Sequence, residues 1–201
     1  MSVTGAVVTE VAPPAPACVS GMWRAVATDP ADQANARLPL RRETDHFALH
    51  WVGELVTAAD AEAAGKHLEY VWGEFIGRIG YPEPDCTRAE KRKVSVFVGA
   101  DYGLIGGADN LGQLGTWIGL GGVRDRFGLA HERTHALQVG SGGLRDSPFT
   151  GWLFESHANW MTHQLPEFGP RPIARCCRST IRTSTLAPRG CDTATGSSWS
   201  I

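Results

Sequence analysis

The sequence has no hydrophobic run long enough to cross a membrane and no large excess of charge of either sign. No apolar stretch approaches the ~20 residues that a membrane-spanning helix needs. The 19 Lys and Arg against 21 Asp and Glu give a formal net charge of -2. This balance provides no electrostatic attraction for nucleic acid or for an anionic membrane. We therefore expect neither a membrane span nor a nucleic-acid partner.

Cysteine is scarce, and its five positions follow no metal-binding or redox pattern. The chain has no CxxC pair, and an odd number of cysteines fits no closed disulfide framework. Cys18 and Cys86 lie in the better-ordered part of the sequence and can pair if the protein is exported. Free buried thiols are an equal alternative. Cysteine usage alone therefore leaves the cellular compartment open.

The first 21 residues, "MSVTGAVVTEVAPPAPACVSG", contain no basic segment, and prolines interrupt their short apolar stretch. They lack the composition of a functional signal peptide, and are either a flexible leader or a non-native start in place of one. Ala, Pro and Asp remain frequent up to about residue 40, a composition typical of irregular structure. We therefore expect residues 1–43 to form an irregular lead-in.

The remaining composition is ordinary for a soluble globular protein. A chain of 201 residues is long enough for one domain with a proper core, or for one domain and a fragment of another. Residues 46–53, "HFALHWVG", alternate in polarity and predict a strand. Residues 93–100, "KVSVFVGA", are almost wholly apolar and predict a central strand. Between them, residues 57–80 predict a helix with Thr57 as its N-cap and Gly80 as its end.

Glycine is concentrated in residues 101–122, but the order of elements there does not match the GxGxxG nucleotide-binding fingerprint. Within this region "GTWIGLG" predicts a strand at a sheet edge, or one that another backbone approaches closely. Two helices follow at about 127–140 and 151–164. Strands followed by helices, with a mixed sheet, predict an α+β fold.

The segment from Arg171 onward differs from the rest of the chain in composition. It contains ten Ser or Thr, five Arg and three of the five cysteines, without helical or strand periodicity. It is typical of a disordered tail, but also of a GC-rich gene read out of frame, which is the interpretation we favour. We expect residues 169–201 to add nothing to the fold, and the natural C-terminal half to be missing.

The segment "LAHERTHALQ" (129–138) carries an HExxH motif on a helix. Residues four apart share a helix face, so His131 and His135 can offer two imidazole nitrogens to one metal ion. Glu132 is rotated by about 100° from His131, where its carboxylate can take a proton from a water that zinc activates. The alternative is a solvated polar helix. Apolar neighbours favour a largely buried helix instead, in which these polar side chains need partners.

A hydrolytic zinc ion needs three protein ligands and one open position. Glu155 follows His135 by 20 residues, in "GWLFESHANW", and can supply the third ligand if its helix packs across the first. Asn159 is one turn beyond Glu155 and can accept the other ring N–H of a zinc-binding histidine. We therefore predict one Zn2+ per chain, bound by His131, His135 and Glu155, with Glu132 as general base.

The motifs "AHERTHALQ" and "GWLFESHANWM" resemble those of the gluzincin metallopeptidases. In that clan a ligand Glu follows HExxH by about twenty residues, on the next helix, and an Asp commonly stands four positions after that Glu. More narrowly, residues 44–168 resemble the Svx/AvrXca-like secreted bacterial metallopeptidases. The resemblance implies a zincin-like domain, an exported protein and a peptide or protein substrate. It assigns the same three ligands and the same base, with Asn159 in place of the usual Asp.

The sequence departs from the gluzincin pattern at both ends. No segment after residue 170 matches the subdomain that supplies a Tyr, His or Arg hydrogen-bond donor, unless Arg171 or Arg175 takes that role. The start lacks the export signal that the family implies. Of the other histidines, His157 is two residues after Glu155 and so points to another face of the helix. We therefore expect a structural role for His157. His163 lies two turns beyond Glu155 and can reach the rim of the cleft.

Three functions are compatible with these residues. The first is a zinc-dependent peptidase, with its cleft between the two helices and "GTWIGLG" as the edge strand that pairs with substrate. The second is a truncated, non-catalytic protein that binds zinc or a partner. The third is a zinc hydrolase of another amide or an ester. Glu132 favours catalysis, because structural zinc sites are more often closed by four Cys or His ligands.

Overall fold

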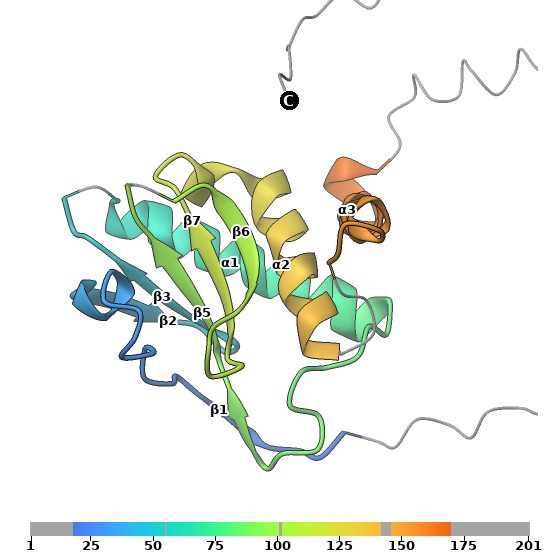
Figure 1. The fold of residues 1–201 in the computed structure, drawn as a ribbon, viewed down its shortest axis with the longest axis horizontal. Coiled ribbons are helices and arrows are strands. Elements are labelled where there is room, and N and C mark those ends of the chain that lie inside the picture. The colour runs from blue at the N-terminus through green and yellow to red at the C-terminus, as the bar shows by residue number, and fades with distance from the viewer. Residues whose placement is uncertain (1–17, 55, 101, 142–145, 170–201) are drawn as a thin grey trace, which may run out of the picture. The chain divides into compact units, whose positions relative to one another are not determined.

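The computed structural model describes residues 18–54, 56–100, 102–141 and 146–169 (Figure 1). These residues form an α+β fold with a mixed sheet and three α-helices, α1 (Ala58–Trp72), α2 (Arg126–Ser141) and α3 (Gly151–Thr162). The fold class predicted from the sequence is therefore confirmed at this level. None of the helices in the described ranges is long and apolar enough to span a bilayer.

The main sheet has five strands in the order β2-β3-β5-β7-β6. The three inner strands are parallel, and each outer strand is antiparallel to its neighbour. Their bounds are β2 Leu40–Glu43, β3 Phe47–Trp51, β5 Val94–Val98, β6 Leu104–Ala108 and β7 Leu114–Ile118. The apolar strand predicted at 93–100 is β5, and it is central as expected.

Helix α1 begins where the sequence predicts, because the Thr57 side chain accepts a hydrogen bond from the Asp60 backbone N–H. The helix continues through a π-helical segment, Gly73–Arg78, and stops before Gly80, whose φ of +80° favours glycine. Its buried face includes Leu68, which is fully buried and contributes ~1.5–3 kcal/mol by its removal from water.

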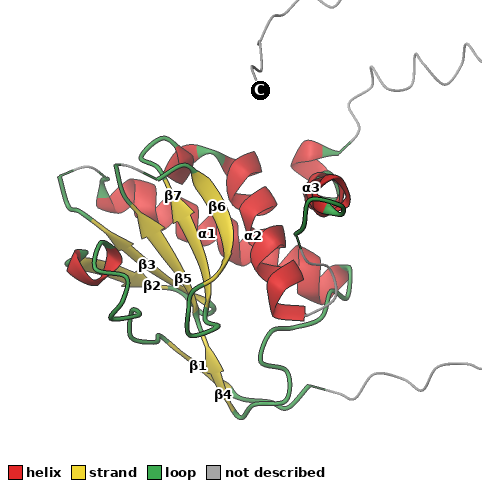
Figure 2. Cartoon of the chain, viewed as in Figure 1, coloured by secondary structure: helices red, strands yellow, loops and turns green. Residues whose placement is uncertain are grey.

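The core lies between one face of the sheet and the helices α1 and α2 (Figure 2). Phe47 and Leu49 of β3 pack there with Leu129 of α2. The opposite face of β3 is also buried, although the alternation in the sequence predicts only one apolar face. There the ring of His50 stacks on Phe97 at 5.1 Å. Both faces of the central strands are therefore covered.

The described part of the expected irregular lead-in, residues 18–43, is irregular except for two short strands and one 3-10 turn, Asn35–Arg37. Strand β2 belongs to the main sheet, and β1 (Met22–Arg24) pairs in parallel with β4 (Glu90–Arg92) in a separate two-stranded sheet. A disulfide joins Cys18 to Cys86, which resolves the alternative of free thiols. These short, charged edge strands show no hydrophobic alternation, so periodicity could not reveal them. The expected tail, 169–201, lies outside the described residues except for Gly169.

Candidate metal centre

The HExxH motif lies in the middle of helix α2, as the sequence predicts. The side chain of Asp125 accepts a hydrogen bond from the Gly128 backbone N–H at 2.9 Å and so caps the start of the helix. The two apolar residues before the motif and the two after it are buried: Leu129, Ala130, Ala136 and Leu137. Helix α2 is therefore held on several sides, and its polar side chains have fixed surroundings.

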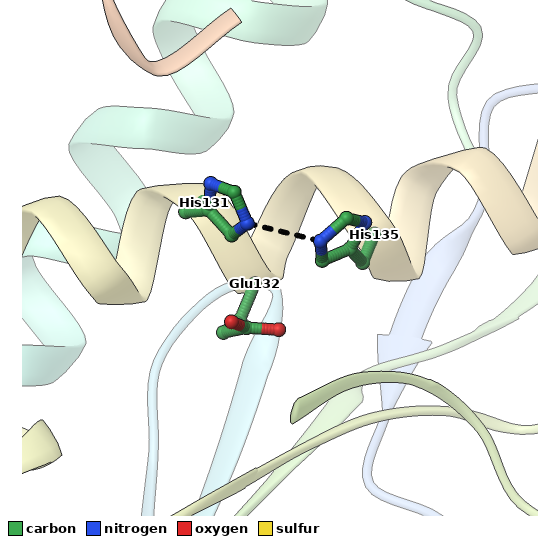
Figure 3. Close-up of side chains that lie close together, drawn as sticks. All are labelled: His131, Glu132 and His135. Atoms are coloured by element: carbon green, nitrogen blue, oxygen red, sulfur yellow. Dashed lines mark hydrogen bonds between the residues drawn. The ribbon is translucent and has the colours of Figure 1, made fainter. Parts of the chain in front are cut away.

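Two imidazole nitrogens and a carboxylate converge beside α2. The Nε2 atoms of His131 and His135 are 3.0 Å apart (Figure 3). Glu155 of α3 places one carboxylate oxygen 3.1 Å from Nε2 of His131 and the other 3.3 Å from Nε2 of His135. The structure thus brings together the three residues that the sequence predicts as ligands.

The spacing of these atoms fits a tetrahedral metal ion. Two ligand atoms, each ~2.0–2.1 Å from one tetrahedral zinc ion, stand ~3.3 Å apart. Two imidazoles and one carboxylate are also a donor set that zinc prefers in catalytic sites. The Glu155 side chain is 59% exposed, against 6% for His135. The site is therefore open on the side of α3.

Glu132 is an alternative third ligand, because its carboxylate lies within 4.8 Å of the ligand nitrogens of both histidines. Glu155 is closer to both, and Glu132 leaves the helix on a different side from the imidazoles (Figure 3). We therefore assign the ligand position to Glu155 and leave Glu132 beside the site.

Burial raises the pKa of Glu132 to about 7. A hydrogen bond with the Gly106 backbone acts in the opposite direction, and the charge of Glu155 adds to the increase. Burial disfavours the charged form of every group, so it lowers the pKa of His131, whose charged form is protonated. The His135 imidazole lowers the pKa of His131 further. Near neutral pH the site thus combines a neutral His131 with a carboxyl group that can exchange a proton.

Gly106 of β6 is a functional residue that the sequence did not identify individually. A Cβ atom at this position would lie 1.9 Å from the carbonyl oxygen of Glu132, so only glycine lets the strand pass so close to the helix. The close backbone approach expected within "GTWIGLG" occurs at Gly119, where a Cβ would lie 2.4 Å from the Tyr102 carbonyl oxygen, and Gly106 lies outside that segment. No local pattern distinguishes Gly106 from the other glycines of residues 101–122.

Asn159 lies beside His131, as predicted. It raises the pKa of that imidazole by a side-chain hydrogen bond, yet the buried Nδ1 of His131 has no partner of normal hydrogen-bond geometry. The contact between Asn159 and His131 is therefore long or poorly aligned. Asn159 is in the predicted place without making the predicted strong hydrogen bond.

Gln138 makes the contact that was expected of Asn159, but to the other histidine. Its Oε1 lies 2.8 Å from Nδ1 of His135. Its Nε2 donates to the Phe154 carbonyl oxygen at 3.0 Å and lies 2.8 Å from Nδ1 of His157. His157 therefore has a structural place, as predicted. Gln138 follows His135 by three residues, which makes them neighbours on the helix surface, and this spacing could have predicted their contact from the sequence.

His163 does not join the three ligands. Its Nδ1 donates to the Phe168 carbonyl oxygen at 2.6 Å, and its ring contacts Phe127 edge to face. The ring of Phe127 in turn stacks at 6.3 Å from that of His131. The ring of Phe127 therefore contacts both His163 and the candidate ligand His131.

The strand predicted in "GTWIGLG" is present, but the prediction that it forms the edge of the sheet is wrong. "GTWIGLG" contains β7, which pairs with β5 on one side and β6 on the other. The edge strand is β6, "LIGGA", which packs against α2. Its two glycines have low intrinsic preference for strands, so tertiary packing rather than local propensity places it there.

A protein-family model described as a family of unknown function (DUF6055) matches residues 23–181, well over half of the chain. The match includes strand β2 and all of β1 except its first residue, and it extends into the segment after Arg171. No curated protein and no solved structure matches the chain. The chain therefore belongs to the DUF6055 family.

Proposed function

We propose that this protein is a zinc-dependent hydrolase of peptide bonds with a zincin-like fold of the gluzincin type. The proposal is carried by one observation, the convergence of His131, His135 and Glu155 within 3.0 to 3.3 Å of one another. The resemblance of the two motifs to gluzincins points in the same direction.

His131, His135 and Glu155 would hold one zinc ion. When bound, zinc supplies Lewis acidity and lowers the pKa of water toward ~7. Glu132 then takes a proton from the attacking water and returns it to the leaving amine. Its raised pKa of about 7 makes it a stronger base than an ordinary carboxylate. The charge of the bound zinc ion would lower the pKa of Glu132 again and keep its carboxylate ionised, as a base must be.

The free side of β6 suits an extended peptide substrate. Among the described strands β6 is an edge of the main sheet, and it lies against the helix that carries HExxH. An extended chain can add to such an edge through main-chain hydrogen bonds. The substrate would then run past Glu132, because the Gly106 backbone touches that residue.

The disulfide supports an exported protein. Disulfides form and persist in oxidising compartments and are rare in the cytosol. The Cys18–Cys86 bond joins the N-terminal segment to residues 86–93. Backbone hydrogen bonds also connect the two segments, such as the one from Val19 N–H to the Cys86 carbonyl oxygen at 2.9 Å. Secretion, which the family resemblance implies, therefore remains part of the proposal.

The test combines zinc content with proteolysis of casein in the wild type and two variants. We expect one zinc per chain in protein purified without chelator. Glu132→Gln should retain zinc and lose turnover, because an amide cannot accept the proton. His135→Ala should lose both. Absence of stoichiometric zinc in the wild type contradicts the proposal, and equal zinc loss in both variants contradicts the role of Glu132 as base.

A further inference from the structure

Gln138 is a fully buried polar side chain that contacts both helices of the candidate metal centre. It lies on α2, one turn after His135. Its amide group faces Nδ1 of His135, the carbonyl oxygen of Phe154 and Nδ1 of His157. Phe154 directly precedes Glu155 in α3. One side chain therefore connects a candidate ligand on α2 with the turn of α3 that carries another.

The partners of Gln138 determine the orientation of its amide group. The Phe154 carbonyl oxygen can only accept a hydrogen bond, so the group facing it must be the amide NH2. The opposite orientation would place two acceptor oxygens 3.0 Å apart in a buried site. Oε1 therefore faces His135, and Nδ1 of that imidazole must be the donor.

This orientation determines the tautomer of His135. A neutral imidazole carries one N–H, and here it is on Nδ1. Nε2 is then unprotonated, and its lone pair faces His131 and Glu155, as a metal ligand requires. By the same reasoning, Nδ1 of His157 accepts from Gln138 and its N–H is on Nε2.

We propose that Gln138 is the positioning residue of this centre: it holds His135 in the Nδ1–H tautomer and fixes α3 so that Glu155 meets the histidines. The metal-binding part of this inference rests on the proposed function, whereas the tautomer does not. Partners that orient a histidine ligand in this way typically change metal affinity 10–100-fold when they are removed.

Three variants separate this role from simple structural support. Gln138→Met keeps the length of the side chain but removes every hydrogen bond. Gln138→Glu keeps an acceptor for His135 and removes the donor to Phe154. The control is Thr162→Val on α3, seven residues after Glu155, which removes one buried hydrogen bond, from the Thr162 hydroxyl to the Ala158 carbonyl oxygen at 2.9 Å.

The first measurement is the tautomer of His135 in the zinc-free wild type, by long-range 1H–15N NMR at about pH 8, well above the ordinary histidine pKa of ~6.5. We expect the Nδ1–H form. This form should be lost in Gln138→Met and kept in Gln138→Glu and Thr162→Val. An Nε2–H tautomer in the wild type overturns the proposal without the need for any variant.

The second measurement is zinc affinity, by competition with a chromophoric chelator. We expect Gln138→Met to bind zinc ~10–100-fold more weakly than the wild type, and Gln138→Glu to recover only the part of this loss that comes from the tautomer of His135, because it lacks the donor to Phe154. Thr162→Val should retain the wild-type affinity. A Gln138→Met affinity within twofold of the wild type overturns the positioning role. Failure of the wild type to bind zinc overturns the proposed function and this metal-binding part, while the tautomer still decides the role of Gln138.

Discussion

Arg133 is the largest side chain that the structure buries completely among the described residues. Its guanidinium lies over the rings of Trp72 and Phe47, at 4.6 and 5.2 Å, and none of its three nitrogens has a hydrogen-bond partner within the described residues. Burial lowers the pKa of Arg133 to about 9, although the charge of Glu69 acts in the opposite direction. A buried charge costs several kcal/mol, and ring contacts return ~2 kcal/mol of this cost.

Replacement of this cation by an apolar side chain should therefore stabilise the protein. We expect Arg133→Met to raise the free energy of unfolding by ~1–4 kcal/mol, as found when buried charges are replaced by well-packed apolar groups. Urea unfolding followed by circular dichroism measures the change. A decrease of ~3–5 kcal/mol would show instead that the guanidinium has an anionic partner.

At the scale of elements, the contact between α2 and β6 positions Glu132, the proposed general base. Gly106 and Gly107 are neighbours in β6 but face opposite sides of the sheet. A Cβ at Gly106 would overlap the Glu132 carbonyl, whereas a Cβ at Gly107 meets nothing within 4 Å. The two positions therefore form a matched pair, one at the helix contact and one outside it.

Gly106→Ala should push β6 away from α2. We expect the free energy of unfolding to fall by ~1–3 kcal/mol, the usual cost of overpacking, and turnover by the folded protein to fall as Glu132 moves. Gly107→Ala should stay within ~0.5 kcal/mol of the wild type. Urea unfolding and the casein assay check both variants. Equal effects would mean that the helix contact does not depend on this glycine.

At the scale of the whole described chain, the Cys18–Cys86 disulfide closes a long loop, with a sequence separation of 68 residues. It holds β1 beside β4 and so keeps Trp23 against His46 and Trp72, with ring centroids 5.0 Å apart in each case. Cross-linking residues so distant in sequence restricts the unfolded chain strongly.

Removal of this cross-link should therefore destabilise the protein globally. The double variant Cys18→Ser, Cys86→Ser should lose ~2–5 kcal/mol of unfolding free energy. Urea unfolding of the variant and of the wild type with and without reductant gives the value. The reduced wild type should match the variant. An unchanged unfolding midpoint would mean that the cross-link itself contributes nothing to stability.

Local patterns predicted the helices and the central strand, because they depend on neighbours in sequence. The N-cap at Thr57 and the apolar steps after it determine α1, and the unbroken apolar run of β5 indicates a strand buried on both faces. The charged strands β1, β2 and β4 have no such signal. They form because another strand or the disulfide lies beside them.

The sequence by itself determined that His131 and His135 share a helix face, since that follows from the helical repeat alone. Only the tertiary structure decided that Glu155 meets them, that β6 rather than β7 is the edge strand, and that Gln138 rather than Asn159 makes the strong hydrogen bond to a histidine. These contacts depend on how α2, α3 and β6 pack against one another. Packing is set by the shapes of many side chains together, with Gly106 permitting the closest approach, and no local periodicity encodes it.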